Sequence, residues 1–211
     1  MRIISGSLKG RKIPDAFKAQ GVKPSSDLLK GVLFNILGKD IEGKVFCDLY
    51  AGTGNVGFEA LSRGASFCIF VERSRSLVSR INRLSKEFGV SGRTKTISGD
   101  VLKVVSNGLL KDRKCDIIFL DPPYNFNLAG KTVNALANNG NNDNNDKSRL
   151  GAVVFSQTKG SPSPALAQAK SIIIVQHHKK EALDAQYSNY CLADRKIHGR
   201  TALSIYNYKA S

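Results

Sequence analysis

The chain has 211 residues, 41% of them hydrophobic, which suits one α/β domain with a sizeable core and a small appendage. Its formal net charge of +15 favours a polyanionic partner, because neutralised phosphates release counterions. The sequence shows neither the apolar core of a signal peptide at its start nor a membrane-spanning stretch, so we expect a cytoplasmic protein without a membrane partner.

Residues 1–39 form a basic segment that carries eight Lys or Arg residues and two Asp residues. Ile3–Ser5 and Arg11–Ile13 are predicted to pair as a short hairpin. A helix with one apolar face is expected from Leu28 to Ile36, capped by Ser25 or Ser26 and ended by Gly38. We therefore predict a basic N-terminal extension over residues 1–39 and a second domain over residues 40–211.

Strand-like and helical stretches alternate in the second domain. Helices are expected at Asn55–Arg63, Ser74–Phe88 and Val101–Leu110. Seven strands are expected, namely Val45–Leu49, Phe67–Val71, Thr94–Ile97, Cys115–Leu120, Ser171–Val175 and two in the tail from Tyr190 to Tyr208. Continuous apolar strands between helices indicate an α/β fold with a mostly parallel sheet covered on both faces, and the tail suggests an antiparallel edge hairpin.

Residues 138–170 depart from this alternation. They begin with an Asn-rich run that cannot bury a core, and Ser161-Pro162-Ser163-Pro164 follows. We expect a largely flexible insertion there, with a short strand at Gly151–Phe155 as its one ordered part.

The four cysteines, Cys47, Cys68, Cys115 and Cys191, are far apart in the sequence. Three of them fall in apolar strand-like runs, where cysteine behaves as a small hydrophobic residue. Their spacing is not that of a zinc site, so we expect no metal and reduced thiols.

A glycine-rich turn follows the first strand and opens a helix. Gly52, Gly54 and Gly57 match the pattern GxGxxG, which lets a backbone turn sharply and approach a ligand closely. Glu72 ends the second strand, where a carboxylate can accept both ribose hydroxyls of an adenosine. Asp100 follows the third strand and either accepts the adenine amine beside Val101 or caps a helix, two roles that can coexist. These glycines fit NAD as well as S-adenosylmethionine.

Asp121-Pro122-Pro123-Tyr124 comes directly after the fourth strand, at the edge where open α/β sheets build their sites. The aspartate can accept a hydrogen bond from an exocyclic amine, the rigid prolines can aim carbonyls into the site, and the tyrosine can stack on a base. Methyl transfer to an amine uses such a clamp, whereas hydride transfer has no evident use for it. The clamp therefore favours S-adenosylmethionine over NAD.

Two motifs resemble those of a known class of enzymes. Asp48–Gly57 resembles motif I of class I methyltransferases, and Asp121–Tyr124 resembles the (D/N/S)PP(Y/F/W) motif of amino-methyltransferases that act on nucleic-acid bases. Further segments resemble the bacterial 16S rRNA guanine-N2 methyltransferase family, RsmD. They are Gly6–Lys12, Lys23–Asp27, Leu33–Leu37, Glu59–Ala65 and Gly199–Tyr206.

The resemblance implies a Rossmann-like methyltransferase that modifies the N2 amine of one guanine in small-subunit rRNA, within a ribosomal assembly particle. Asp121, Pro122, Pro123 and Tyr124 would hold the base, and we expect a monomer. S-adenosylmethionine, which leaves as S-adenosylhomocysteine, would be held by Asp48, Tyr50, Ala51, Gly52, Thr53, Gly54, Glu72, Asp100, Val101 and Asp121. RNA phosphates would be bound by Arg2, Lys9, Arg11, Lys12 and Lys23, for which a solvated surface is the alternative.

Two other functions fit parts of the sequence. A catalytically silent rRNA-binding or assembly factor would keep the fold, although Asp121 and the glycines are intact. A DNA adenine or cytosine amino-methyltransferase would normally carry a sizeable target-recognition domain, for which 211 residues leave little room.

Overall fold

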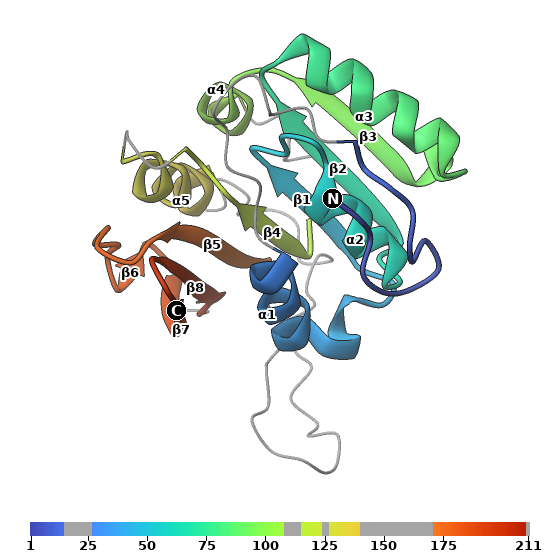
Figure 1. Ribbon diagram of the computed structural model, residues 1–211. Helices are drawn as coiled ribbons and strands as arrows, with labels where there is room; N and C mark the ends of the chain where they lie inside the picture. Colours follow the sequence, from blue (N-terminus) through green and yellow to red (C-terminus); the bar gives the residue numbers. More distant parts are fainter. Residues whose placement is uncertain (15–26, 108–114, 124–126, 140–170, 210–211) are drawn as a thin grey trace.

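A computed structural model describes residues 1–14, 27–107, 115–123, 127–139 and 171–209. Its centre is an eight-stranded sheet of order β3-β2-β1-β4-β5-β8-β7-β6 (Figure 1). The five parallel strands are β1 (Val45–Leu49), β2 (Phe67–Glu72), β3 (Thr94–Ser98), β4 (Ile117–Leu120) and β5 (Ile172–His178). The antiparallel strands are β6 (Gln186–Tyr187), β7 (Tyr190–His198) and β8 (Thr201–Tyr208).

Helices cover both faces of the sheet, as the continuous apolar strands predict. On one face, α1 (Asp27–Leu37), α2 (Asn55–Ser62) and α3 (Arg75–Glu87) contribute side chains such as Phe34, Phe58 and Leu84 to one buried cluster. On the other face, α4 (Val101–Ser106) and α5 (Leu128–Asn139) contribute Val104 and Val133 to a second cluster. Single-turn 3-10 helices, Gly38–Ile41 and Ser91–Arg93, lead into β1 and β3.

The amino-terminal segment lies along α2. Arg2 and Lys12 form an isolated antiparallel bridge, with Ile3 N donating to Arg11 O at 3.1 Å. Ile3, Leu8 and Ile13 are buried in the same cluster as α1 and α2, so this segment packs directly on the sheet domain.

Most predicted elements are confirmed, with boundaries that agree or differ by one to three residues. The helix predicted at Val101–Leu110 is observed over Val101–Ser106, and residues 108–110 lie outside the described residues. The sheet has eight strands rather than seven, because the two-residue β6 adds an edge beyond β7. Helix α5 was not predicted, and it places Asn138 and Asn139 in a helix rather than in the flexible insertion. The predicted strand Gly151–Phe155 and the rest of the insertion lie outside the described residues, and the division at residue 39 stays a prediction.

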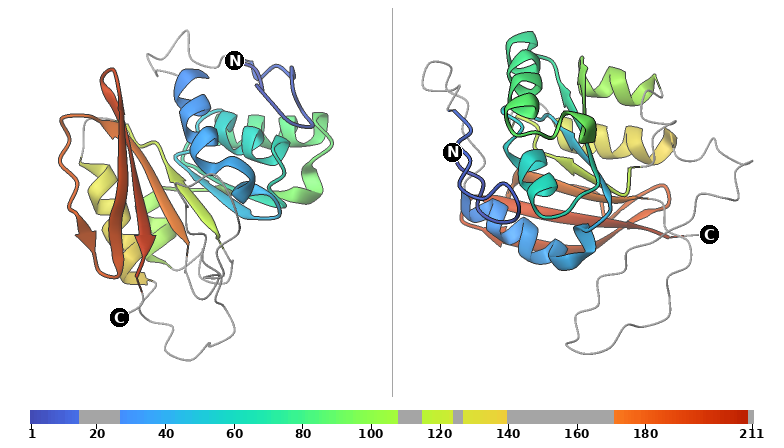
Figure 2. Two further views of the ribbon diagram at one scale, coloured as in Figure 1. Left: turned by 90° about the horizontal axis from the view of Figure 1, so that it is seen from below. Right: turned by 90° about the vertical axis from the view of Figure 1, so that its right-hand side faces the viewer.

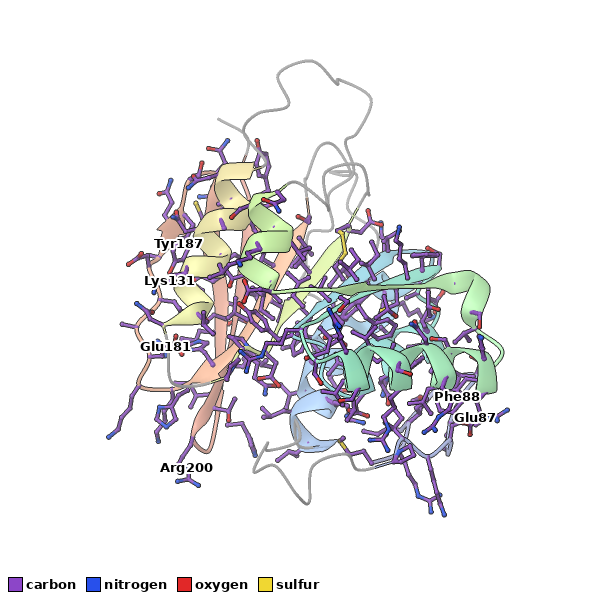
Figure 3. The ribbon with its side chains drawn as sticks, turned by 90° about the horizontal axis from the view of Figure 1, so that it is seen from above. Glu87, Phe88, Lys131, Glu181, Tyr187 and Arg200 are labelled. Carbon is purple, nitrogen blue, oxygen red and sulfur yellow. A yellow bond between two sulfur atoms is a disulfide. The ribbon has the colours of Figure 1, made fainter. Side chains whose placement is uncertain are left out.

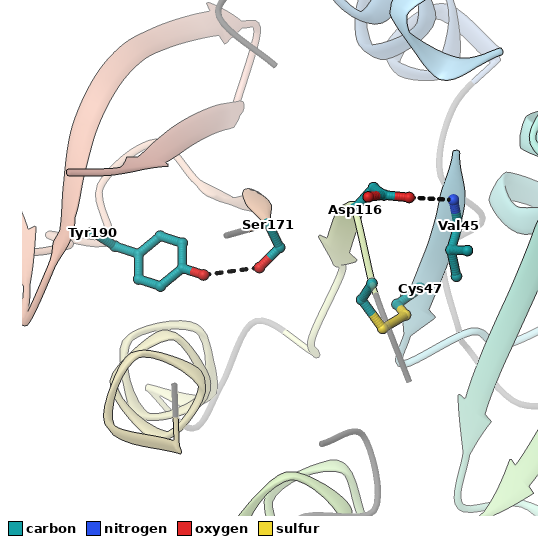
Figure 4. Close-up of a disulfide and its surroundings, with 6 residues drawn as sticks. Val45, Cys47, Asp116, Ser171 and Tyr190 are labelled. Atoms are coloured by element: carbon teal, nitrogen blue, oxygen red, sulfur yellow. Dashed lines mark hydrogen bonds between the residues drawn. A yellow bond between two sulfur atoms is a disulfide. The ribbon is translucent and has the colours of Figure 1, made fainter. Parts of the chain in front are cut away.

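The expectation of four free thiols is wrong for one pair. Cys47 on β1 and Cys115, just before β4, form a disulfide with a Cα–Cα distance of 6.1 Å (Figure 4). The neighbouring Val45 N donates to the Asp116 carboxylate at 2.9 Å, which fixes the same strand pair at its amino end. The two cysteines are 68 residues apart, so their proximity depends on the β1–β4 register and could not be read from local spacing. Cys68 and Cys191 are free.

No helix in the described part of the chain is long and apolar enough to cross a membrane.

Candidate active site

The loop between β1 and α2 is shaped by its glycines. Gly54 precedes α2 with φ at +77°, a left-handed conformation that side chains other than glycine's rarely adopt. A Cβ atom on Gly57 would lie 2.3 Å from the Phe70 ring, so only glycine lets α2 pack this closely on β2. Gly57 N also donates to the Asp48 carboxylate at 2.9 Å, which ties the helix to the end of β1.

Glu72 holds this loop from the end of β2. Its two carboxylate oxygens accept hydrogen bonds from Gly52 N at 2.9 Å and from Ser74 N at 2.8 Å. An ionised carboxylate offers about four lone-pair positions, so both oxygens retain acceptor capacity for a ligand hydroxyl. Glu72 therefore orders the turn that would hold a cofactor and can also contact that cofactor.

Asp121 follows β4 at the same edge of the sheet. Its Oδ1 atom accepts a hydrogen bond from Gln176 Nε2 on β5 at 2.9 Å. Gln176 is buried, so this bond fixes the rotamer of the half-buried carboxylate. Gln176 was not predicted as a site residue. The signal that could have found it is its place at the end of the apolar run that forms β5.

Three carboxylates thus meet at the carboxyl ends of three neighbouring strands, β2, β1 and β4. Burial raises the pKa of Asp48 well above its ordinary value, and the charges of Asp121 and Glu72 raise it further, although the Gly57 N–H lowers it. This group of three acidic side chains stands out in a chain of net charge +15. A cationic ligand such as a sulfonium would be stabilised here by simple charge complementarity. The residues present therefore fit S-adenosylmethionine.

The other predicted cofactor contacts surround this cluster. Asp100 caps α4 by accepting a hydrogen bond from Lys103 N at 3.1 Å, and Val101 beside it is buried. Tyr50 has a positive φ of 66°, and its hydroxyl lies 2.7 Å from Thr132 Oγ1 on α5. A strained backbone at a ligand-facing turn is common in functional sites. Ala51 and Thr53 are buried in the loop.

The predicted base clamp is described in part. Pro122 is buried and Pro123 is exposed directly after Asp121, whereas Tyr124 lies outside the described residues. Among the residues that the structure describes, no three His, Cys, Asp or Glu side chains are grouped as metal ligands would be.

The predicted RNA-binding residues that the structure describes lie on the amino-terminal segment, which is bonded to Glu59 and Ser62 of α2. The backbone oxygen of Arg2 accepts a hydrogen bond from the buried Lys30 Nζ at 3.0 Å, and Lys30 also reaches Asn55 at the start of α2. The backbone of Arg11 lies beside Ile3, and its guanidinium is 5.8 Å from the centre of the Phe88 ring after α3. Arg2, Lys9, Arg11 and Lys12 are all exposed, and Lys23 lies outside the described residues.

A buried ion pair anchors this basic segment. Glu59 accepts hydrogen bonds from the backbone of Ile4 at 2.8 Å and of Ser5 at 3.0 Å, and from Arg63 Nε at 2.9 Å. Lys30 Nζ lies 3.8 Å from the same carboxylate. Two backbone hydrogen bonds to a fully buried carboxylate therefore tie the segment to α2.

His177 on β5 makes the fold sensitive to acid. It is fully buried, its Nδ1 donates to His178 O at 3.0 Å, and its Nε2 lies 2.8 Å from Ser204 Oγ. Burial lowers the pKa of His177 below its ordinary value of 6.5, so the folded state binds fewer protons than the unfolded state near that pH. His177 therefore contributes stability above pH 6.5 that is lost as the pH falls below it.

We expect His177→Gln to cost about 1–2 kcal/mol at pH 7.5, the usual scale for lost buried hydrogen bonds. The variant should also lose less stability than the wild type between pH 7.5 and 5.5. Thermal denaturation over this range measures both effects. Equal declines in the two proteins would show that another group carries the pH dependence.

The fold and this site define a class of protein: the chain has the Rossmann-like fold of methyltransferases. A putative methyltransferase from Escherichia coli superposes with a TM-score of 0.72 at 25% identity, over 100% of this chain and 99% of that chain. An RNA methyltransferase from Salinibacter ruber, solved with S-adenosyl-L-homocysteine, shares the fold at a TM-score of 0.58 and 13% identity, over 90% of this chain and 95% of that chain.

The family is shown by the sequence as well. Residues 1–147 match the family model described as conserved hypothetical protein 95, and the chain belongs to this family. Ribosomal RNA small subunit methyltransferase D from Haemophilus influenzae is 34% identical over 143 residues, which cover 66% of this chain and 72% of that protein. The protein of the same name from Escherichia coli K12 is 26% identical over 210 residues, covering 100% of this chain and 91% of that protein.

Proposed function

We propose that this protein transfers a methyl group from S-adenosylmethionine to the exocyclic N2 amine of a guanine in small-subunit rRNA, acting in the cytoplasm. Family membership supports the reaction class, because relatives across the length of the chain are named rRNA small subunit methyltransferases. The observation that carries the proposal is the placement of Asp121, held by Gln176, on the strand next to the glycine loop that Glu72 orders.

The cofactor would be held at the ends of β1, β2 and β3. Glu72 would accept the ribose hydroxyls, Asp100 the adenine amine, and the loop from Ala51 to Gly54 would contact the amino-acid part. Bound there, S-adenosylmethionine supplies a methyl group already activated by its positive sulfur. The protein's own task is then to align a weak nucleophile, and proximity supplies much of the rate.

Asp121 would act on the nucleophile. A guanine amine is a poor nucleophile because its lone pair is delocalised into the ring. The Asp121 carboxylate and the Pro122 carbonyl would accept hydrogen bonds from the two N–H groups of the amine. These bonds would aim the nitrogen lone pair at the methyl carbon and stabilise the positive charge that develops on nitrogen. Tyr124 would stack on a base turned out of its loop.

The direct test is chemical. Purified protein is incubated with tritiated S-adenosylmethionine and unmethylated small-subunit rRNA, either naked or in an assembly particle, and the digested nucleosides are separated. The expected product is N2-methylguanosine. Label in methyladenosine or methylcytidine would contradict the substrate assignment, and rRNA binding without any label would favour a silent assembly factor.

The basic N-terminal segment is proposed to bind RNA phosphates. We expect Arg11→Glu combined with Lys12→Glu to weaken rRNA binding and to lower the salt slope of log K by about 1.5, because each phosphate contact contributes roughly 0.7 to 0.9. Fluorescence anisotropy between 50 and 300 mM salt measures the slope. Lys95→Glu with Lys209→Glu, two exposed lysines on β3 and after β8, is the matched control. An unchanged slope in the Arg11/Lys12 variant would remove these residues from the interface.

A further inference from the structure

A row of side chains leads from Asp121 across the antiparallel strands at the catalytic edge. Leu120 pairs with Val175, which places Gln176 beside Asp121. Gln176 pairs with Leu203 on β8, and Leu203 pairs with Lys196 on β7. Because directly paired residues of adjacent strands share a face, Lys196 lies on the face of the sheet that carries Gln176.

A second row on the same face lies two residues nearer the carboxyl end of β5. His178 pairs with Thr201, and Thr201 pairs with His198. The β7–β8 turn at Gly199 and Arg200 therefore projects at the edge of the sheet where Asp121 lies. In the left view of Figure 2, the turn of the red hairpin and the amino terminus lie on one side of the molecule and the carboxyl terminus on the other. Figure 3 shows the Arg200 side chain pointing away from the body of the protein at this turn.

The end of this hairpin is exposed and basic. We define the hairpin-tip platform as Lys179, Lys180, Lys196, His198 and Arg200, all of which are exposed. The Lys196 side chain is 48% exposed and pairs with Asp194 at 3.0 Å, an exposed pair of the kind that contributes little to stability.

The platform is also rigid. Lys179 N donates to Arg200 O at 2.9 Å, which ties the turn after β5 to the turn between β7 and β8. Arg195 Nη2 donates to Lys179 O at 2.8 Å and fixes the same turn from β7. Because the backbone of these turns is already braced, binding a ligand there does not require the loops to be ordered first.

We propose that the hairpin-tip platform binds the RNA strand on one side of the target guanine. This inference rests on the proposed function, because it takes RNA as the substrate. At about 4.8 Å per strand, β7 lies roughly 14 Å from Asp121, so the platform reaches nucleotides that flank the base in the site. Its lysines and Arg200 meet phosphates, and the exposed His198 ring offers a face for stacking on an unpaired base.

The test compares two pairs of substitutions with the same change in charge. Lys196→Glu with Arg200→Glu alters the platform, and Lys95→Glu with Lys209→Glu alters exposed lysines away from the tip. Binding of a fluorescein-labelled 30-nucleotide RNA stem-loop with guanines in its loop, and of purified small-subunit rRNA, is measured at 100 mM salt. The platform variant should bind at least tenfold more weakly, and the control should stay within twofold of the wild type.

Further measurements keep the outcomes distinct. The neutral pair Lys196→Gln with Arg200→Gln should give a smaller loss in the same direction, with unchanged thermal stability. Equal RNA binding by the wild type and both platform variants would overturn the proposal. It would also be overturned if poly-glutamate displaced the labelled RNA as effectively as unlabelled RNA of equal charge. If the wild type binds RNA through the platform but transfers no methyl group, the result contradicts the proposed function and supports the platform as an RNA-binding surface. If the wild type methylates RNA and the platform variants have the same kcat/KM, the result contradicts only the role of the platform.

Discussion

Asp121→Ala is expected to bind S-adenosylmethionine with nearly wild-type affinity and to transfer its methyl group about 10²–10³-fold more slowly, the usual loss when one preorganised electrostatic partner of a transition state is removed. Cofactor binding should largely survive because Glu72 and Asp48 remain, and they hold the cofactor loop through Gly52 N and Gly57 N. Its loss removes the acceptor that aligns the amine and stabilises the charge forming on it.

Calorimetry of cofactor binding and tritium transfer into small-subunit rRNA separate these two effects. Asp40→Ala, which removes an exposed carboxylate from the turn before β1, is the matched control and should leave both values unchanged. Methyl transfer by Asp121→Ala at the wild-type rate would contradict the role of this residue.

Glu72→Gln is expected to weaken S-adenosylmethionine binding by about 10- to 100-fold. The carboxylate accepts two backbone hydrogen bonds that shape the glycine loop, and hydrogen bonds to charged groups contribute about 1.5–3 kcal/mol. A glutamine keeps the shape but offers only one acceptor oxygen, so either Gly52 N or Ser74 N loses its partner. The proposed bonds to the ribose would weaken as well.

Glu87→Gln on α3 is the control, because Glu87 is exposed (Figure 3) and should leave cofactor affinity unchanged. Thermal denaturation without cofactor shows whether the Glu72 variant stays folded at the assay temperature. An affinity within twofold of the wild type would show that Glu72 only shapes the loop and does not hold the ligand.

The sheet was predictable because four of its parallel strands, β1, β2, β4 and β5, are short and mostly apolar, and the more polar β3 (Thr94–Ser98) is rich in β-branched residues. A short apolar run such as Phe67–Glu72, which lies between helical stretches, is more readily explained as a buried strand than as a helix. The carboxylates that end or follow these strands, Glu72 and Asp121, were predictable for the same reason, since the carboxyl ends of parallel strands share one edge.

Helix α5 was missed because its buried side chains are mostly small. Ala129, Val133 and Ala137 recur every four residues, but they precede an Asn-rich run that weakens the helical signal. The strand β6 has only two residues and depends on its pairing with β7, which no local pattern reveals.

Contacts between distant residues were the least predictable part of the site. The bond from Gln176 to Asp121 spans 55 residues, and the disulfide between Cys47 and Cys115 spans 68. Both depend on strand register, which tertiary packing sets. The position of the basic residues also follows from packing, because Glu59 and Lys30 hold the amino-terminal segment along α2.

The most direct measurement is a map of methylated nucleotides in small-subunit rRNA from cells with and without the gene. Deletion should remove one N2-methylguanosine, and plasmid-borne wild-type protein, but not Asp121→Ala, should restore it. An identical methylation map in the deletion strain, or restoration by Asp121→Ala, would contradict methyl transfer to a guanine amine held by this carboxylate.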